Sequence, residues 1–419
     1  MSFVVPSDWV SWVDYPEDSP FPIQNVPFGL AYHDERSTFA VAAIGEYVID
    51  LVALHAHQII ELPEELAAYG VQTLFWPDAL WMRPVRQRLI ELLHEDHGEL
   101  RDDEVLQSNA FLLQTDVEMR CPSHVPAYVD FYSGIHHASN VGRMFRPDQP
   151  PLLPNYRHIP IAYNGRASSV THIHKEIKRP FGQTKGPHDE SPAFGPTKEL
   201  DFELEMGFIL ASTTDFGETI PIAEAEERIA GLVIVNDWSA RDMQRWEYQP
   251  LGPFLAKTFA TSVSPWVVTL DALTPFRVEG MAQDPAPLPY LAQSGLRHFD
   301  VQLEVTLKTA KTSRPQTICR SNMKNLYWSI AQQLAHQSSN GTPLQSGDLY
   351  ASGTISGETP DSFGSLLELT WRGQNPILVQ ETGETRTFLE DGDTVTMTAF
   401  GQGDGYRIGF GEVSGTIAG

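Results

Sequence analysis

Several features that define other protein classes are scarce in this 419-residue sequence or missing from it. Only two cysteines occur, Cys121 and Cys319, too few for a disulfide framework or for a metal site built from several thiolates. No run of about 18 apolar residues is present, so we expect no transmembrane helix. The N-terminal segment has no basic stretch ahead of an apolar run, which argues against a secretory or organellar leader. We therefore expect a soluble protein of a reducing compartment, the cytoplasm.

Basic residues are also scarce, with 29 Lys and Arg against 54 Asp and Glu and a formal net charge of −25. Nucleic acid and anionic membrane surfaces are not expected as partners, because both require a basic footprint. The sequence lacks a phosphate-binding loop, a dinucleotide-binding fingerprint, a nucleophile elbow and a His-Glu-x-x-His motif. These absences disfavour nucleotide cofactors and serine-hydrolase chemistry.

What remains is typical of a globular protein. Hydrophobic residues make up 41% of the chain and charged residues 20%, enough for a large buried core. The length predicts two domains. In the first, taken as residues 1–118, strand-like runs at 39–43 and 47–51 precede a helical pattern at 78–97, which fits a small barrel with a helix.

The second domain, taken as residues 119–419, is dominated by strand patterns. They occur at 230–235, 266–270, 301–307 and 394–398. A single clear helical pattern spans 322–336, with apolar residues on one face. We therefore predict a mostly β (α+β) protein, with a small N-terminal domain in front of a larger catalytic domain.

Acidic side chains recur in three segments of this second domain, at Asp130, Glu203, Glu205 and Asp237. Four carboxylates could enclose a hard divalent cation, which prefers oxygen ligands. In the alternating segment 200–208, Asp201 shares one strand face with both glutamates, and that face could equally be solvated. Asp237 could instead cap a helix that begins beside it. Metal-assisted hydrolysis is the hypothesis that uses all four.

Two adjacent histidines, His136 and His137, follow the first acidic segment. One of them could act as a base near neutral pH, or simply form structural hydrogen bonds. On an extended segment the two would point in opposite directions, so at most one would serve the site. Glu368 lies between leucines, where we expect an apolar strand. A carboxylate in such surroundings needs a partner, and a histidine would provide one.

A polar helix face is predicted after Asp237. Arg241, Gln244 and Tyr248 are spaced i, i+3 and i+7, so they lie on one side of a helix. A guanidinium, an amide and a phenol together could bind a carboxylate or an oxyanion, although the same spacing occurs on ordinary surface helices. Arg143 and Arg146 offer a second opportunity for anion recognition.

Together these segments resemble the fumarylacetoacetate hydrolase family in its full-length, two-domain form. The resemblance runs from about residue 119 to the C-terminus. It is carried by Asp130-Phe-Tyr-Ser, His137-Ala-Ser-Asn-Val-Gly, Met144-Phe-Arg, Tyr163-Asn-Gly-Arg-Ala-Ser-Ser, Glu203-Leu-Glu, Asn236-Asp-Trp-Ser-Ala-Arg-Asp, Trp246-Glu-Tyr-Gln-Pro-Leu-Gly-Pro-Phe, Ala351-Ser-Gly-Thr-Ile-Ser-Gly and Gln402-Gly-Asp-Gly-Tyr. The N-terminal unit is similar to the SH3-like barrel domain of that family. The resemblance implies a catalytic domain of β-sandwich or roll type.

The resemblance also implies an activity: a metal-dependent hydrolase acting on carbon–carbon bonds in ketonic substances. Its small diketo acid substrate would be 4-fumarylacetoacetate, and its products fumarate and acetoacetate, in the last step of tyrosine and phenylalanine breakdown. A homodimer is implied as well. By position, the ligands of a divalent cation, Ca²⁺ or Mg²⁺, would be Asp130, Glu203, Glu205 and Asp237.

The remaining roles implied by the resemblance concern catalysis and binding. His137 would be the general base and Glu368 its orienting partner. Developing negative charge would be stabilised by Arg241, Gln244 and Lys257. The diketo acid would be positioned by Tyr132, Arg146, Tyr163, Gln244, Tyr248 and Thr354. Lys257 and Thr261 would offer a second cation contact, and they flank Ala260, where the family usually has glycine.

Two other functions remain open at this point. One is another reaction of the same superfamily, such as acylpyruvate hydrolysis, decarboxylation or hydration. The other is a non-catalytic calcium-binding protein. The N-terminal domain and the His137/Glu368 pair favour fumarylacetoacetate hydrolysis over the first alternative. A non-catalytic calcium-binding protein would have no role for the polar helix face that begins at Arg241.

Overall fold

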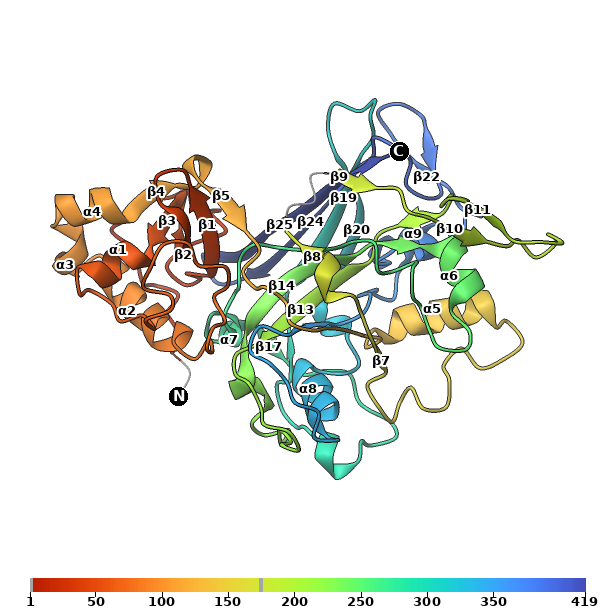
Figure 1. Ribbon diagram of the computed structural model, residues 1–419, viewed down its shortest axis with the longest axis horizontal. Coiled ribbons are helices and arrows are strands. Elements are labelled where there is room, and N and C mark those ends of the chain that lie inside the picture. The colour runs from red at the N-terminus through yellow and green to blue at the C-terminus, as the bar shows by residue number, and fades with distance from the viewer. Residues whose placement is uncertain (1–2, 173–175) are drawn as a thin grey trace.

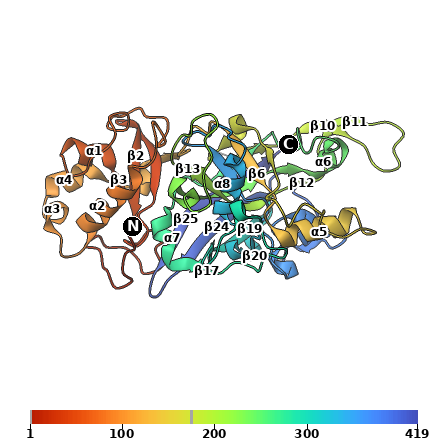
Figure 2. The same ribbon diagram turned by 90° about the horizontal axis from the view of Figure 1, so that it is seen from below.

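The computed structural model of the chain describes residues 3–172 and 176–419. A small N-terminal unit lies at one end of a larger, strand-rich C-terminal unit (Figure 1). The same arrangement is seen after a quarter turn (Figure 2). The two-domain, mostly β organisation predicted from the sequence is therefore confirmed. No helix of these described ranges has the length and apolar character needed to cross a membrane.

The N-terminal unit is built on a five-stranded antiparallel sheet in the order β4-β3-β2-β1-β5. Its strands are β1 (Phe28–His33), β2 (Ser37–Ile44), β3 (Tyr47–Asp50), β4 (Phe111–Leu113) and β5 (Glu118–Arg120). Its helices are α1 (Leu51–Ala56), α2 (Met82–Leu93), α3 (Gly98–Arg101) and α4 (Glu104–Ala110). The helix predicted at 78–97 is α2, which buries Val85, Leu89 and Leu93 on one face.

The C-terminal unit contains two large sheets. The first has seven strands, in the order β7 (Ala162–Asn164), β6 (Tyr128–Phe131), β21 (Leu349–Ala351), β13 (Leu204–Leu210), β14 (Ile229–Asp237), β16 (Thr261–Val263) and β8 (Val170–Thr171). The second has five, in the order β20 (Gln316–Asn322), β19 (Gln302–Lys308), β24 (Thr394–Gln402), β25 (Arg407–Ala418) and β9 (Glu176–Lys178). Side chains from both sheets form one hydrophobic core.

Smaller elements complete this unit. The two-stranded sheets are β10 (Phe181–Thr184) with β11 (Ala193–Pro196), β12 (Leu200–Asp201) with β15 (Ser239–Ala240), β17 (Arg277–Val278) with β18 (His298–Phe299), and β22 (Ile377–Leu378) with β23 (Thr385–Arg386). The α-helices are α5 (Ile135–Phe145), α6 (Arg241–Glu247), α7 (Leu270–Leu273), α8 (Ile330–Ser338) and α9 (Leu366–Leu369). Its short 3₁₀ turns are η2 (Ala167–Ser169), η3 (Ala225–Arg228), η4 (Thr274–Phe276), η5 (Pro289–Leu291), η6 (Met323–Asn325) and η7 (Pro360–Ser362), whereas η1 (Gln114–Asp116) belongs to the N-terminal unit, between β4 and β5.

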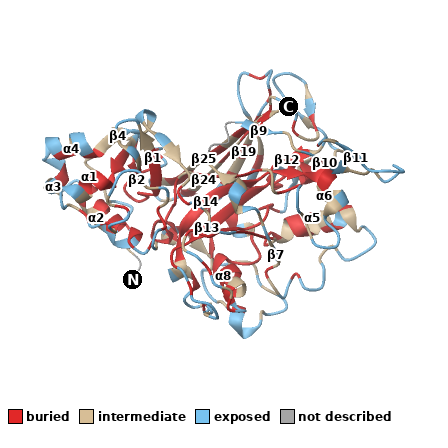
Figure 3. Cartoon of the chain, viewed as in Figure 1, coloured by how far each residue is buried: buried red, intermediate tan, exposed pale blue. Residues whose placement is uncertain are grey.

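Both faces of the seven-stranded sheet are covered, and its central strands are buried throughout (Figure 3). In β14, Leu232 and Ile234 belong to the core between the two large sheets. Val233 and Val235 point the other way, into a core shared with the N-terminal unit. A strand buried on both faces reads as a continuous apolar run rather than an alternating one. By contrast, β19 buries alternate residues, as the pattern at 301–307 predicts.

Two element predictions are wrong in detail. The run at 266–270 forms isolated bridges through Val267 and Val268 instead of a strand, and α7 begins at Leu270. The helical pattern at 322–336 is divided into η6 and α8. Ser329 accounts for the division, because it caps the start of α8 in a reciprocal capping box with Gln332.

Candidate active site

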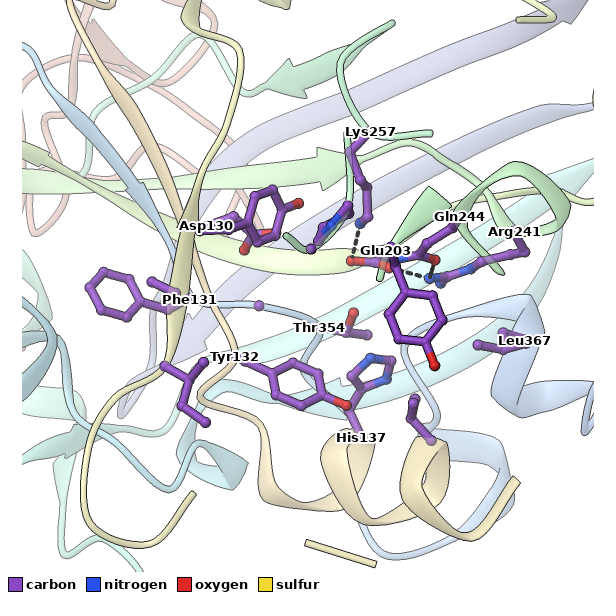
Figure 4. Close-up of a pocket in the computed structure, with 18 of the residues that line it drawn as sticks. Asp130, Phe131, Tyr132, His137, Glu203, Arg241, Gln244, Lys257, Thr354 and Leu367 are labelled. Carbon is purple, nitrogen blue, oxygen red and sulfur yellow. Dashed lines mark hydrogen bonds and ion pairs between the residues drawn. The ribbon is translucent and has the colours of Figure 1, made fainter. Parts of the chain in front are cut away.

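A cavity of about 410 Å³ lies where several strands of the seven-stranded sheet end (Figure 4). β6 and β21 run parallel, and both end at this edge. β13 is antiparallel to β21 and therefore begins here, and β14 is antiparallel to β13 and ends here. Polar residues at these strand ends are brought together from segments far apart in the sequence. The lining includes Asp130, Tyr132, His137, Arg146, Tyr163, Glu203, Arg241, Gln244, Tyr248, Lys257 and Thr354.

The four predicted metal ligands lie together, and two of them, Asp130 and Glu203, line this cavity. Oxygen atoms of Asp130, Glu203, Glu205 and Asp237 are all within 4.8 Å of one another, and all four residues are buried. The alternative of a solvated strand face is therefore wrong for Glu203 and Glu205. Asp237 is not a helix cap either, because it ends β14 and the N-cap of α6 is Ala240.

Hydrogen bonds fix these carboxylates but leave some of their oxygens unsatisfied. Glu205 Oε2 accepts from the Gly353 amide at 2.9 Å. Gly353 has a φ of 77°, and a β-carbon there would clash with the Phe131 carbonyl oxygen, so only glycine suits this approach. Asp130 Oδ1 and Glu205 Oε1 are buried without a hydrogen-bond partner among the described residues. Buried, unpaired carboxylate oxygens at this spacing fit a divalent cation.

Two cationic side chains face the four carboxylates. Lys257 Nζ lies 2.7 Å from both Glu203 Oε2 and Asp237 Oδ2. Arg241 Nη1 lies 2.5 Å from Glu203 Oε1. Burial alone would raise the pKa of Glu203, but these two cations lower it. Burial and repulsion from neighbouring carboxylates raise the pKa of Asp130 and of Glu205. The four carboxylates outnumber the two cationic side chains, and a divalent cation among them would relieve the repulsion that raises these two pKa values.

His137 and Glu368 form a buried pair beside this cluster. His137 Nδ1 lies 2.6 Å from Glu368 Oε2. The histidines are not on an extended segment, since both belong to α5, which begins after Gly134. Successive residues of a helix also point in different directions, and only His137 lines the cavity. Glu368 is in α9 instead of the predicted strand, because a short apolar run suits either element.

The Glu368 carboxylate accepts three further hydrogen bonds. The donors are Asn140 Nδ2 at 2.9 Å, Ser356 Oγ at 2.8 Å and Ser365 Oγ at 3.0 Å. Burial would raise the pKa of Glu368, but His137 and these donors outweigh it and lower the pKa. The carboxylate is thereby kept ionised and fixed, and it holds the Nδ1 side of the imidazole. The other ring nitrogen of His137, Nε2, is the one left for proton transfer.

The predicted polar helix face is formed by α6 and its C-cap. Arg241 and Gln244 are in α6, and Tyr248 is the capping residue. Arg241 Nη1 donates to Gln244 Oε1 at 3.2 Å, which leaves the amide nitrogen of Gln244 as its remaining donor. Arg241 Nη2 is buried and has no partner among the described residues. Tyr248 is 42% exposed and lies at the mouth of the cavity.

The other predicted binding residues also line the cavity. The Tyr132 ring stands edge-on to the imidazole of His137, with centroids 5.5 Å apart. Tyr163 donates to Asp237 Oδ2 at 3.0 Å. Arg146 Nε and Thr354 Oγ1 are buried without a partner in the described ranges, so both can still donate to a ligand. Arg143 does not contribute to the lining and donates to Asn140 Oδ1 instead.

The predicted second cation contact falls on residues that already have partners. Thr261 Oγ1 donates to Asp237 Oδ1 at 2.9 Å, so it touches the cluster through one of its carboxylates. The methyl group of Ala260 is buried in the main hydrophobic core.

The sequence did not reveal the residues that form hydrogen bonds with the predicted site residues. Asn140 is three positions after His137, a spacing that places both on one helix face, and this signal could have been used. Ser356 holds Glu368 from outside its helix, and no local pattern marks it. Ser365 is the N-cap residue of α9 and precedes Glu368 in a Ser-x-x-Glu pattern, a local signal that could have been used. Asp201 was seen only as a member of an acidic strand face, yet its carboxylate accepts from Arg241 Nε at 2.8 Å.

Comparison with known proteins relates both units to one family. The family model described as fumarylacetoacetate (FAA) hydrolase C-terminal matches residues 127–418, and that described as fumarylacetoacetase N-terminal matches residues 24–122. The chain is 47% identical over 419 residues to fumarylacetoacetase of Rattus norvegicus, covering 97% of this chain and 98% of that protein. It is 44% identical over 417 residues to fumarylacetoacetase of Arabidopsis thaliana, with 97% and 98% covered.

Solved structures show the same fold at much lower identity. A putative HpcE protein from Mycobacterium smegmatis superimposes with a TM-score of 0.51 and 18% identity. The match covers 93% of this chain and 98% of that one.

Proposed function

Since the chain belongs to the fumarylacetoacetate hydrolase family, in its full-length two-domain form, we propose that it hydrolyses the carbon–carbon bond of fumarylacetoacetate with a divalent cation and a histidine-activated water. The products are fumarate and acetoacetate. This makes it a hydrolase of tyrosine and phenylalanine breakdown. One observation carries the mechanism: a buried His137–Glu368 pair and a buried carboxylate cluster border the same cavity.

The cation would be held by the cluster of Asp130, Glu203, Glu205 and Asp237. Ca²⁺ and Mg²⁺ both suit a set of carboxylate oxygens. When bound, such a cation supplies Lewis-acid polarisation of the diketone oxygens.

His137 is the general base of the proposed reaction. Cleaving a bond next to a carbonyl requires a nucleophilic water, whose proton must be accepted as the water attacks. His137 Nε2 accepts this proton, while Glu368 holds Nδ1–H and stabilises the imidazolium that forms. The four hydrogen bonds to Glu368 fix the orientation of the dyad before substrate arrives.

Three side chains meet the charge that develops on the substrate. Arg241 offers its unpaired Nη2, Gln244 its amide nitrogen, and Lys257 its ammonium group. Fixed donors in a buried site stabilise an oxyanion without reorganising. Burial would lower the pKa of Lys257, but Asp237 and Glu203 raise it, so the side chain keeps its charge.

Five further residues of the cavity lining bind the substrate: Tyr132, Arg146, Tyr163, Tyr248 and Thr354. The guanidinium of Arg146 suits the terminal carboxylate of a diketo acid. Local cations matter here because the net charge of −25 repels an anionic substrate. We also propose that the protein works as a homodimer in the cytoplasm.

A steady-state assay with fumarylacetoacetate tests this function. The protein should consume it and release fumarate and acetoacetate in equal amounts. Exhaustive chelation should abolish turnover, and separate addition of Ca²⁺ and Mg²⁺ should show which restores it. Full turnover after chelation would remove the cation from the mechanism, and no turnover with any cation would refute the proposed substrate.

A further inference from the structure

Asp201 is buried and hydrogen-bonded, unlike a residue on the solvated face of a strand. It is fully buried at the end of β12. Its Oδ2 accepts from Arg241 Nε at 2.8 Å and from the Leu367 amide at 3.0 Å. Its Oδ1 accepts from the Leu366 amide at 2.7 Å. One carboxylate therefore joins the Arg241 side chain to the first turn of α9.

Asp201 thus contacts two elements that carry different catalytic groups of the proposed reaction. Arg241 is the first residue of α6, and β15, which precedes it, pairs with β12. The third residue of α9 is Glu368, whose carboxylate orients His137. Backbone amides at a helix N-terminus favour a negative charge, which suits Asp201 to this place. The geometry thus connects an oxyanion donor and the base through one side chain.

We propose that Asp201 is a positioning residue that keeps Arg241 and the His137–Glu368 pair in mutual register for the reaction. This inference rests on the proposed function, and it adds a residue that itself touches no substrate. The single carboxylate holds Arg241 and the start of α9, the helix that carries Glu368, so its loss should misplace both. Displacements of about 1 Å at catalytic groups lower turnover by up to about a hundredfold.

A purely structural role is the competing explanation, and the chain contains a matched control for it. Asp393 is also fully buried and accepts from Arg386 Nε at 2.8 Å and Nη2 at 3.1 Å. It also accepts from the Glu390 amide at 2.9 Å. Neither Asp393 nor Arg386 lines the cavity. Asp201→Asn and Asp393→Asn therefore each remove a buried carboxylate that pairs with an arginine. The first does so beside the cavity and the second away from it.

The first readout is kinetic. Asp201→Asn should lower kcat by about tenfold to a hundredfold with a smaller change in KM, and Asp393→Asn should leave both near the wild-type values. If Asp201 acts through Arg241, the double variant Asp201→Asn/Arg241→Lys should be little slower than Arg241→Lys alone. The proposal would be overturned by a wild-type kcat for Asp201→Asn. It would also be overturned if the double variant lost as much activity as the two single variants lose together.

The second readout does not depend on activity. The short His137–Glu368 hydrogen bond should give a low-field proton resonance, identified by its absence from Glu368→Gln. It should shift in Asp201→Asn and stay in place in Asp393→Asn. If Asp201→Asn fails to fold, the resonance should still shift in Arg241→Lys, which keeps the charge but loses Nε. An unmoved resonance would overturn the proposal.

The same variants separate this inference from the proposed function. If Glu368→Gln keeps the wild-type kcat, the proposed dyad fails whatever Asp201 does. If Glu368→Gln is slow while Asp201→Asn keeps its kcat, only the role of Asp201 fails.

Discussion

His137 Nδ1 and Glu368 Oε2 lie 2.6 Å apart, although 231 positions separate the two residues in the chain. Both side chains are almost completely buried. Their pairing joins α5 to α9 beside the cavity. It also fixes which imidazole nitrogen faces away from the carboxylate, and this orientation is the basis of the first three predictions.

Replacing Glu368 by Gln should slow turnover by more than about tenfold. The substitution keeps the size of the side chain but removes the charge that stabilises the imidazolium. Affinity for the cation should hardly change, because the four carboxylates of the cluster are other residues. Steady-state kinetics and calorimetric titration with Ca²⁺ or Mg²⁺ measure the two effects. As a control, Glu226→Gln alters a glutamate that pairs with Arg277 outside the cavity. Wild-type turnover in Glu368→Gln would separate His137 from this partner.

Stability should depend on pH through the same glutamate. The pKa of Glu368 is lowered from 4.5, since His137 and the hydrogen bonds outweigh the effect of burial. A carboxyl with a lowered folded-state pKa binds fewer protons when folded. Its stabilising contribution is complete above about pH 4.5 and is lost as the pH falls through the folded-state pKa. The difference in urea midpoint between wild type and Glu368→Gln should therefore shrink as the pH falls below about 4.5. A difference in urea midpoint that does not change with pH would contradict the lowered pKa of Glu368.

The two adjacent histidines should behave differently. His137→Ala should lose about a hundredfold or more in kcat, the scale expected for removing acid–base catalysis. His136→Ala should keep most activity, because His136 does not line the cavity. Each variant is the control for the other, since they remove the same side chain from successive positions of α5. The reverse result would assign the base to the wrong histidine.

Arg146 should act mainly in substrate binding. Arg146→Lys retains the positive charge but loses the planar set of donors, including the buried Nε that has no partner in the described ranges. We expect a raised KM with a smaller change in kcat. Arg143→Lys is the matched control, because Arg143 is in the last turn of α5, next to its C-cap Arg146, and lies outside the lining. Equal KM values for wild type and Arg146→Lys would exclude Arg146 from binding.

Neutralising one carboxylate of the cluster should weaken cation binding and catalysis together. Asp130→Asn keeps the shape of a side chain whose Oδ1 has no hydrogen-bond partner among the described residues, so folding should tolerate it. Calorimetric affinity for Ca²⁺ or Mg²⁺ should fall, and a higher cation concentration should partly restore turnover. Asp300→Asn, outside the cluster, is the control. Unchanged affinity would remove Asp130 from the ligand set.

Sequence patterns located most of the site because its residue types are chemically unusual. The alternation at 200–208 placed Glu203 and Glu205 on one face, and helical spacing placed Arg241 beside Gln244. Those patterns are local, whereas the burial of these glutamates depends on residues distant in the sequence, such as Lys257 and Gly353. Glu368 was assigned to a strand because a short apolar run has no diagnostic period.

Not every partner of a catalytic group could be read from the sequence. Ser365 lies only three positions before Glu368, whereas Asn140 and Ser356 reach the Glu368 carboxylate through tertiary structure. The role of Asp201 was hidden for the same reason, because its partners are a side chain 40 positions away and backbone amides 165 and 166 positions away. Such contacts depend on the path of the whole chain.

The hydrophobic core shared by the two units affects how substitutions can lower the activity of the protein. Val233 and Val235 of β14 are packed together with residues of the N-terminal unit such as Phe28 and Leu89, and none of the residues lining the cavity belongs to residues 3–122. A substitution that weakens this packing would leave every reacting group intact in each folded molecule. It would instead reduce the number of folded molecules, because unfolded chains are removed by chaperones and proteases. Activity would then be lost through a unit that contributes no residue to the cavity lining, as a shortage of enzyme with normal turnover per molecule.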